Sequence, residues 1–211
     1  MENADVTALV NWHINALNTF TGTKTQCHAA HIVALCFFPK LKDMSSGGNM
    51  IREATKDDCI QLAVLSIKVW LDTYATDGIK DEYAQFVLST FTQSYFVELL
   101  NSPKFRLLVS EENQALQGYV LLNLESYYET PQSGFEIEKL YVDSTFRGRG
   151  LGRKLLTEVE RQFGKKYWLY TWVENESNGF YAHLGFKQVG LYSFEFAGTK
   201  IDNNVYLSVH T

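Results

Sequence analysis

A glycine-rich stretch of seven residues constrains this chain more than any other feature. Residues 147–153 read Arg-Gly-Arg-Gly-Leu-Gly-Arg, between an apolar stretch that ends at Val142 and a helical pattern. Glycines at a strand-to-helix junction let the backbone approach a ligand closely, and the free N–H groups of the first helical turn suit a pyrophosphate. The stretch therefore predicts a phosphate-binding turn. The alternative is a tight turn that the fold alone requires.

Three arginines support the phosphate interpretation, because Arg147, Arg149 and Arg153 can each form charge-assisted hydrogen bonds to phosphate. Two other phosphate motifs are excluded. No Gly-Lys-Ser/Thr follows, as a P-loop requires, and the preceding segments predict an antiparallel hairpin, unlike a dinucleotide-binding fold.

A second segment supplies the context. Residues 170–186 combine an apolar strand, an Asn-containing turn, the pair Phe180-Tyr181 and a final Gly185-Phe186. Together with Arg147-x-x-Gly150-x-Gly152, this order resembles the acetyl-CoA motif of the GNAT superfamily of N-acetyltransferases. The resemblance covers residues 50–211.

The resemblance implies an acyl-CoA site in a V-shaped cleft between strand 135–142 and its splayed neighbour 167–173. It places the pantetheine on the backbone of one strand end and the pyrophosphate on the glycine-rich turn; the residues are Leu140, Tyr141, Val142, Arg147, Gly148, Arg149, Gly150, Leu151, Gly152 and Arg153. Asn175 belongs to the same predicted site, although the family has seven positions from this Asn to the Tyr and this chain has six. No metal is expected.

Direct acetyl transfer to an amine needs a base for the nucleophile and an acid for the leaving thiolate. We assign the acid to Tyr181 and the base, or amine-binding carboxylate, to Glu138, acting alone or through water. Glu136 shares its face by the two-residue period of a strand and is expected to bind substrate. The alternatives are that Tyr181 only packs and that the carboxylates are solvated.

The acceptor region is expected over the helix at 56–77, where Trp70 and Tyr74 lie on one face and would suit an alkylamine. Residues 60–85 also look similar to polyamine acetyltransferases. The alternative for both rings is core packing, because the same stripe holds Ile67 and Leu71.

The remaining periodicity predicts a mixed α/β fold, with a mostly antiparallel central sheet flanked by helices. The expected helices span 56–77, 81–88, 92–100, 150–163 and 177–184, and the expected strands span 105–109, 116–124, 135–142, 167–173, 187–196 and 204–209.

Residues 1–49 have a different composition, without sustained periodicity and ending in a Gly/Ser-rich linker, and we expect the catalytic domain to span 50–211. The first part is then a poorly structured extension, or the product of an upstream start with Met50 as the true initiator. Its Cys27, His28, His31 and Cys36 match no common zinc spacing.

Composition narrows the functional class. The chain has 211 residues, a net charge of -5 and three cysteines. This balance disfavours nucleic acid and acidic lipid as partners, and the cysteine usage indicates a reducing compartment, hence the cytoplasm. No apolar run reaches the roughly 20 residues of a membrane span. The expected function is acetyl transfer from acetyl-CoA to a small-molecule or protein amine. The alternative is a catalytically silent acyl-CoA-binding module, and exposed sheet edges are compatible with a homodimer in either case.

Overall fold

The computed structural model describes residues 50–196 and 198–208, all of which lie in one structural unit, Ser46–Thr211. The predicted extension 1–49, with its cysteines and histidines, lies outside the described residues.

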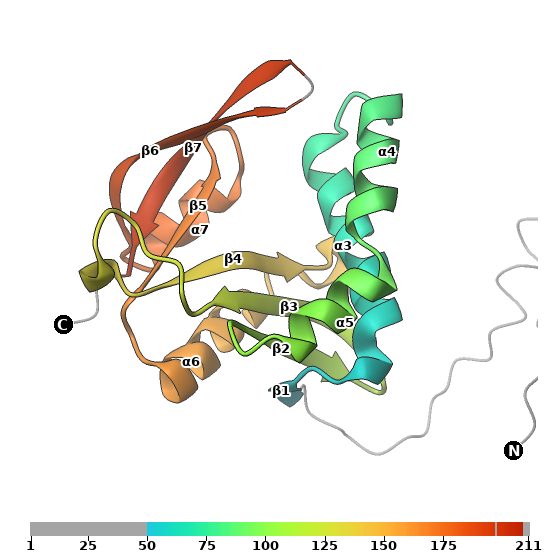
Figure 1. Cartoon of the computed structure of the whole chain (residues 1–211), viewed down its shortest axis with the longest axis horizontal. Helices are drawn as coiled ribbons and strands as arrows, with labels where there is room; N and C mark the ends of the chain where they lie inside the picture. The colour runs from blue at the N-terminus through green and yellow to red at the C-terminus, as the bar shows by residue number, and fades with distance from the viewer. Residues whose placement is uncertain (1–49, 197, 209–211) are drawn as a thin grey trace, which may run out of the picture. The chain divides into compact units, whose positions relative to one another are not determined.

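A seven-stranded sheet forms the centre of the described chain, in the order β1-β2-β3-β4-β5-β7-β6 (Figure 1). Every neighbouring pair is antiparallel except β4 and β5, which are parallel. The strands are β1 (Met50–Glu53), β2 (Phe105–Glu112), β3 (Ala115–Asn123), β4 (Phe135–Val142), β5 (Tyr167–Trp172), β6 (Lys187–Phe196) and β7 (Thr199–Leu207). This is the predicted fold class, a mixed, mostly antiparallel sheet with flanking helices.

Helices cover both faces of the sheet. They are α3 (Cys59–Tyr74), α4 (Asp81–Thr90), α5 (Gln93–Asn101), α6 (Leu151–Phe163) and α7 (Ser177–His183). Alternate residues of the strands divide the core: Leu108 and Leu122 pack with Leu155 of α6, whereas Leu107 and Leu121 pack against α3 and α5. The period of two in the strands thus builds two apolar layers with the sheet between them.

Two N-terminal elements differ from the sequence prediction. The helix predicted at 56–77 begins at Cys59, because a 3₁₀ turn precedes it in which the Asp58 carboxylate accepts from the Thr55 N–H at 2.7 Å. Arg52 donates to the same carboxylate at 2.7 Å, and this contact anchors β1. The sequence analysis missed β1, because four residues are too few to show alternation.

The C-terminal hairpin is longer than predicted. β7 begins at Thr199 instead of residue 204, and its polar segment pairs with β6 from Tyr192↔Asn203 to Phe196↔Thr199. Asp and Asn normally disfavour strands. Here they are accommodated because the hairpin is mostly exposed and Asn203 donates to the Tyr192 carbonyl at 3.2 Å.

Two irregularities of β4 shape the site. β4 and β5 pair only at Phe135↔Tyr167 and Glu136↔Trp168, so the rest of the two strands diverges. On its other side β4 carries a bulge, because Leu121 pairs with Lys139 and Leu122 with Ile137, leaving Glu138 as the extra residue. A bulge redirects side chains, so the two-residue alternation is interrupted at Glu138.

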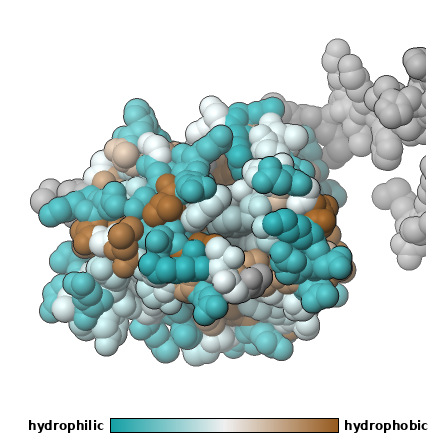
Figure 2. All heavy atoms as spheres, turned by 90° about the horizontal axis from the view of Figure 1, so that it is seen from above, coloured by the Kyte–Doolittle hydropathy of each residue, from teal (hydrophilic) through white to brown (hydrophobic). Residues whose placement is uncertain are grey.

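The surface seen from above carries several separate apolar patches between hydrophilic side chains (Figure 2). Within the described part of the chain, no helix combines the length and the hydropathy that a membrane crossing needs.

Candidate functional site

Strands β4 and β5 diverge where the sequence predicted the cofactor cleft. Because hydrogen bonding stops after the second residue pair, the backbone of residues 137–142 has no β5 partner. Unpaired strand groups can bind an extended ligand. Leu140, Tyr141 and Val142 lie in this segment, as predicted.

The glycine-rich turn closes the open end of this cleft. Gly148 and Gly150 both have positive φ, at 76° and 75°, and a Cβ at either position would meet no heavy atom within 4 Å. Space therefore lies open above the backbone at the start of α6. Gly152 differs, because its Cβ would lie 3.1 Å from Cζ of Phe180. Its lack of a side chain thus also serves the packing of α6 against α7.

The three predicted arginines do not converge. Arg149 lies with its guanidinium 5.0 Å from the Phe146 ring centroid and donates to the Thr145 carbonyl at 3.3 Å. Arg153 lines a hollow of about 370 Å³ beside Ile51 of β1. Arg147 is exposed on the turn. The three arginine side chains thus lie on different sides of the turn. The backbone of the turn is the part that all three surround.

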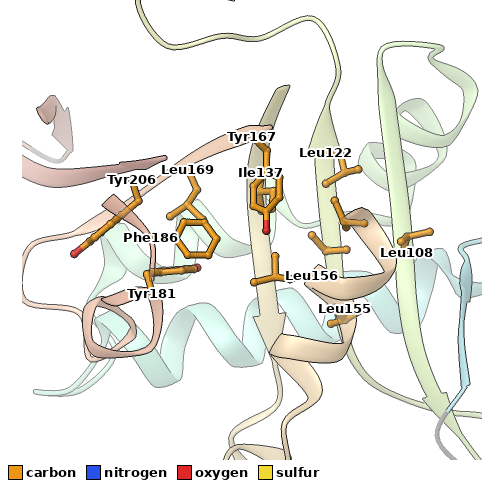
Figure 3. Close-up of a cluster of buried hydrophobic side chains, with 12 residues drawn as sticks. Leu108, Leu122, Ile137, Leu155, Leu156, Tyr167, Leu169, Tyr181, Phe186 and Tyr206 are labelled. Atoms are coloured by element: carbon orange, nitrogen blue, oxygen red, sulfur yellow. The ribbon is translucent and has the colours of Figure 1, made fainter. Parts of the chain in front are cut away.

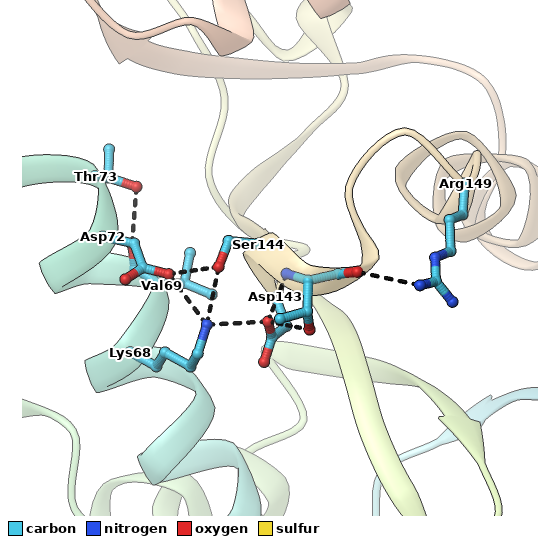
Figure 4. Close-up of polar contacts among 8 residues, drawn as sticks. Lys68, Val69, Asp72, Thr73, Asp143, Ser144 and Arg149 are labelled. Atoms are coloured by element: carbon cyan, nitrogen blue, oxygen red, sulfur yellow. Dashed lines mark hydrogen bonds and ion pairs between the residues drawn. The ribbon is translucent and has the colours of Figure 1, made fainter. Parts of the chain in front are cut away.

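A polar network anchors the turn to helix α3 (Figure 4). The Lys68 ammonium donates to Asp143 at 3.0 Å, to Ser144 at 2.9 Å and to Asp72 at 3.1 Å. Ser144 in turn donates to Asp72 at 2.8 Å, and this bond, together with Lys68 and the nearby Arg147, lowers the pKa of Asp72. The sequence analysis missed this network, because its members are 75 residues apart.

Tyr181 lies on α7, buried to 6% exposure among the rings of Phe180, Phe186 and Tyr206 at 5.3, 5.5 and 5.6 Å (Figure 3). Burial raises its pKa well above that of an ordinary tyrosine, and Tyr74 and Tyr206 add to the shift. The phenol is therefore protonated at neutral pH. An ordinary phenol is protonated there too, and the raised pKa makes Tyr181 a weaker acid, so its predicted role depends on its position and not on this shift.

Asn175 lies at the start of α7, where its side-chain oxygen accepts from the Ser177 N–H at 2.8 Å. It also hydrogen bonds to Tyr74, whose pKa is raised mainly by burial. Asn178, which the sequence analysis passed over, fixes the same turn: it donates to the Trp172 carbonyl at 2.9 Å and accepts from the Tyr206 hydroxyl at 2.8 Å.

Trp70 and Tyr74 have different surroundings. Trp70 is 8% exposed and packs with Tyr83 and Phe86 of α4, so the structure places its ring in the core, the alternative left open by the sequence. Tyr74 reaches across to Trp172 of β5, with ring centroids 5.9 Å apart.

A second hollow, of about 400 Å³, lies where β4 and β5 are still paired. It is lined by carboxylates, one ammonium and aromatic rings from four separate segments: Ser126, Tyr127, Glu136, Glu138, Lys139, Trp168, Tyr170 and Tyr192. We call it the acceptor hollow. The side chains of Glu136 and Glu138 line the same hollow, as predicted. The Lys139 side chain lines it too, because the bulge at Glu138 interrupts the alternation.

The two carboxylates differ in environment. Glu138 accepts from the Asn123 amide at 2.8 Å and lies 3.9 Å from the Lys139 ammonium. Glu136 is 7% exposed, and burial raises its pKa; a hydrogen bond to Ser126 opposes the shift, as do Lys139 and Lys104, whereas Glu138 adds to it. Its protonation equilibrium thus lies closer to neutral pH, as a base requires.

Tyr170 of the acceptor hollow and Tyr181 both lie near Tyr141 of β4. Burial raises the pKa of Tyr141, and both Tyr170 and Tyr181 add to that shift, so both lie within electrostatic reach of the same side chain. Burial, Glu136, Tyr192 and Glu138 raise the pKa of Tyr170 to about 12.

The aromatic lining of the hollow was not predicted. Trp168 and Tyr170 alternate on β5 beside the two glutamates of β4, and this period-two pattern is visible in the sequence. Tyr127 and Tyr192 carry no such signal, because a loop and a distant hairpin bring them in.

Comparison with known proteins gives matches to one family. Residues 103–188 match the family described as Acetyltransferase (GNAT) domain. An uncharacterized N-acetyltransferase of Archaeoglobus fulgidus is 33% identical over 111 residues, which are 52% of this chain and 69% of that protein. An uncharacterized N-acetyltransferase encoded in the pepI 3' region of Lactobacillus delbrueckii subsp. lactis is 26% identical over 145 residues, 65% of this chain and 84% of that protein.

The fold is also found among solved structures. PaiA N-acetyltransferase from Thermoplasma acidophilum, crystallised in complex with coenzyme A, superposes with a TM-score of 0.57 at 17% identity, covering 74% of this chain and 98% of that one.

Proposed function

The chain belongs to the GNAT superfamily of acetyl-CoA-dependent N-acetyltransferases, and from this premise we propose that it transfers the acetyl group of acetyl-CoA to a primary amine by direct attack. The proposal is supported by two carboxylates in one hollow of β4 and β5, one of which has a raised pKa, and by a buried, protonated Tyr181 that lies near the same Tyr141 as Tyr170 of that hollow. An acid and a base with separated pKa values are what acetyl transfer to an amine needs.

The residues of the turn fit the diphosphate of acetyl-CoA. The space above Gly148 and Gly150 would be filled by a Cβ and its substituents, and the first N–H groups of α6 face no intrahelical acceptor. The exposed Arg147 supplies charge there. The backbone of Leu140, Tyr141 and Val142 is available to the amide groups of the pantetheine.

In the proposed mechanism the glutamates exchange the roles expected from the sequence. Glu136 takes the proton of the incoming ammonium, because its charge is the less compensated of the two, and Glu138 orients the amine. The neutral nitrogen attacks the thioester carbonyl to give a tetrahedral intermediate. The C–S bond then breaks, the electron pair leaves on sulfur, and the Tyr181 phenol protonates the thiolate, while the nitrogen loses its second proton to solvent and becomes the neutral amide. Both side chains are reset by solvent.

A thiol-release assay tests the function: purified protein with acetyl-CoA and a panel of small amines, amino acids and peptide N-termini. We expect release of free CoA that depends on an amine and an acetylated product of matching amount. Tight binding of acetyl-CoA in calorimetry without turnover of any amine would instead support the silent binding module.

A further inference from the structure

The acceptor hollow contains one more carboxylate than ammonium groups, so one carboxylate can pair with a cationic ligand. Two carboxylates and one ammonium line the hollow. Glu138 is already compensated by the Asn123 amide and by Lys139, whose ammonium is also held 3.3 Å from the Tyr95 hydroxyl. Glu136 forms no ion pair with any residue that the structure describes. Since a buried carboxylate is costly unless paired, a single ligand ammonium completes this arrangement.

Aromatic rings line one part of the hollow, beside its charged and hydroxyl groups. The Trp168 and Tyr170 rings are 6.1 Å apart, and the Tyr170 and Tyr192 rings 5.1 Å apart. The Trp168 indole N–H donates to the Ser126 carbonyl, and this residue is only 7% exposed, whereas Tyr170 and Tyr192 are 37% and 46% exposed and offer more ring surface. Such rings can bury the apolar part of a ligand, and the face of each ring attracts a cation that lies over it.

We propose that the acceptor is a small monoamine with a ring-sized apolar body and no carboxylate beside its amine. This inference rests on the transferase function proposed above. The ammonium pairs with Glu136 and the apolar body packs on Trp168, Tyr170 and Tyr192. The hollow of about 400 Å³ suits such a molecule, since sites for small ligands begin at roughly 300 Å³.

The same lining disfavours other amines. The carboxylate of an α-amino acid would lie beside Glu136 and Glu138, and like charges in a desolvated site repel strongly. The further ammonium groups of a polyamine would find no second uncompensated carboxylate in the hollow, and Lys139 would repel an ammonium beside it.

A matched set of amines tests the inference in the full-length protein. Phenethylamine, phenylalanine and spermidine are compared by kcat/KM in the thiol-release assay; phenylalanine adds only a carboxylate to the first skeleton. We expect phenethylamine to exceed phenylalanine by at least about a hundredfold, because like-charge contacts cost several kcal/mol, and to exceed spermidine as well. Equal or better turnover of phenylalanine or spermidine overturns the substrate class while leaving the transferase function intact. If no amine reacts although acetyl-CoA binds, the transferase function itself fails.

Two variants of β6 locate the binding surface. Tyr192→Ala removes a wall of the hollow, whereas Leu191→Ala changes the preceding residue, which is 63% exposed and outside the hollow. We expect Tyr192→Ala to raise KM for phenethylamine about tenfold, with a smaller effect on propylamine, which has no ring. Leu191→Ala should change neither. Equal losses for both amines, or for both variants, would show that Tyr192 acts on the fold and would overturn its place in the binding surface.

Discussion

The two ends of the β4–β5 cleft are built in opposite ways. At one end, the turn to which we assign the diphosphate consists of consecutive residues, 143–153, and its key feature is backbone left open by glycine. At the other end, the acceptor hollow collects side chains from β4, β5, β6 and the loop after β3. The first depends on local conformation, and the second on how distant strands pack.

From this difference we expect the first end to vary little between relatives and the second to change with the acceptor. A contiguous turn binds an invariant part of the cosubstrate with N–H groups that every residue has. A composite hollow changes whenever one contributing segment changes, and loops and hairpins accept such change readily.

The largest effect is expected at the turn. Gly150→Trp places a ring in the space above the loop, and we expect acetyl-CoA binding to be lost, measured by calorimetry. The positive φ adds strain of about 1 kcal/mol. Gly164→Trp is a matched control: this glycine ends the same helix, has a φ of 102° and also faces open space, so it should cost similar stability yet bind acetyl-CoA normally. Normal affinity in the Gly150 variant would contradict the placement of the diphosphate.

The next effect joins the two ends. Tyr181→Phe keeps the ring packed against Phe186 and Tyr206 but removes the proton of the phenol. We expect kcat to fall about a hundredfold, at the lower end of general acid catalysis, because a thiolate is a fair leaving group. Affinity for acetyl-CoA should change little. Unchanged turnover, measured where chemistry limits the rate, would leave Tyr181 as a packing residue.

The third prediction concerns pH. Glu136 must be ionised to take a proton, so kcat/KM should rise with pH through its pKa, about tenfold per unit below it. Because burial raises that pKa, this rise should occur above the range of an ordinary glutamate. Glu136→Gln should remove this rise of kcat/KM. The variant should keep only the rise that comes from deprotonation of the substrate ammonium. Glu125→Gln, an exposed carboxylate on the nearby loop, should retain both. An unaltered profile in Glu136→Gln would return the base to Glu138 or water.

The smallest effect tests how the turn is held. Lys68→Met removes the contacts to Asp143 and Ser144 while keeping a side chain of similar length on α3. Exposed ion pairs contribute up to about 1 kcal/mol, so we expect acetyl-CoA to bind about fivefold more weakly. Binding of S-acetylpantetheine, which lacks the diphosphate, should not change. Equal weakening of both ligands would indicate a general effect on the cleft.

Most of the local structure could be predicted from the sequence. The strand Phe135–Val142 follows from its alternation and the hairpin before it from its apolar segments, and the helix predicted at 92–100 begins after Thr92, whose hydroxyl accepts from the Tyr95 N–H at 3.1 Å. The errors occurred where partners override propensity, as at β1 and the polar start of β7. The type of an element depends on residues close by in the sequence. The existence of β1 and the start of β7 depend instead on the opposing strand with which each pairs.

The sequence by itself determined the glycine turn, the tyrosine that follows it on α7 and the two glutamates of β4, because each is encoded within a short stretch with its own periodicity. Only the tertiary structure decided which glutamate is compensated, that Trp70 belongs to the core, and that Tyr127 and Tyr192 line the acceptor hollow. Those properties depend on burial and on charges contributed by segments far apart in the chain, and solvation of a side chain is fixed only when the strands around it have paired.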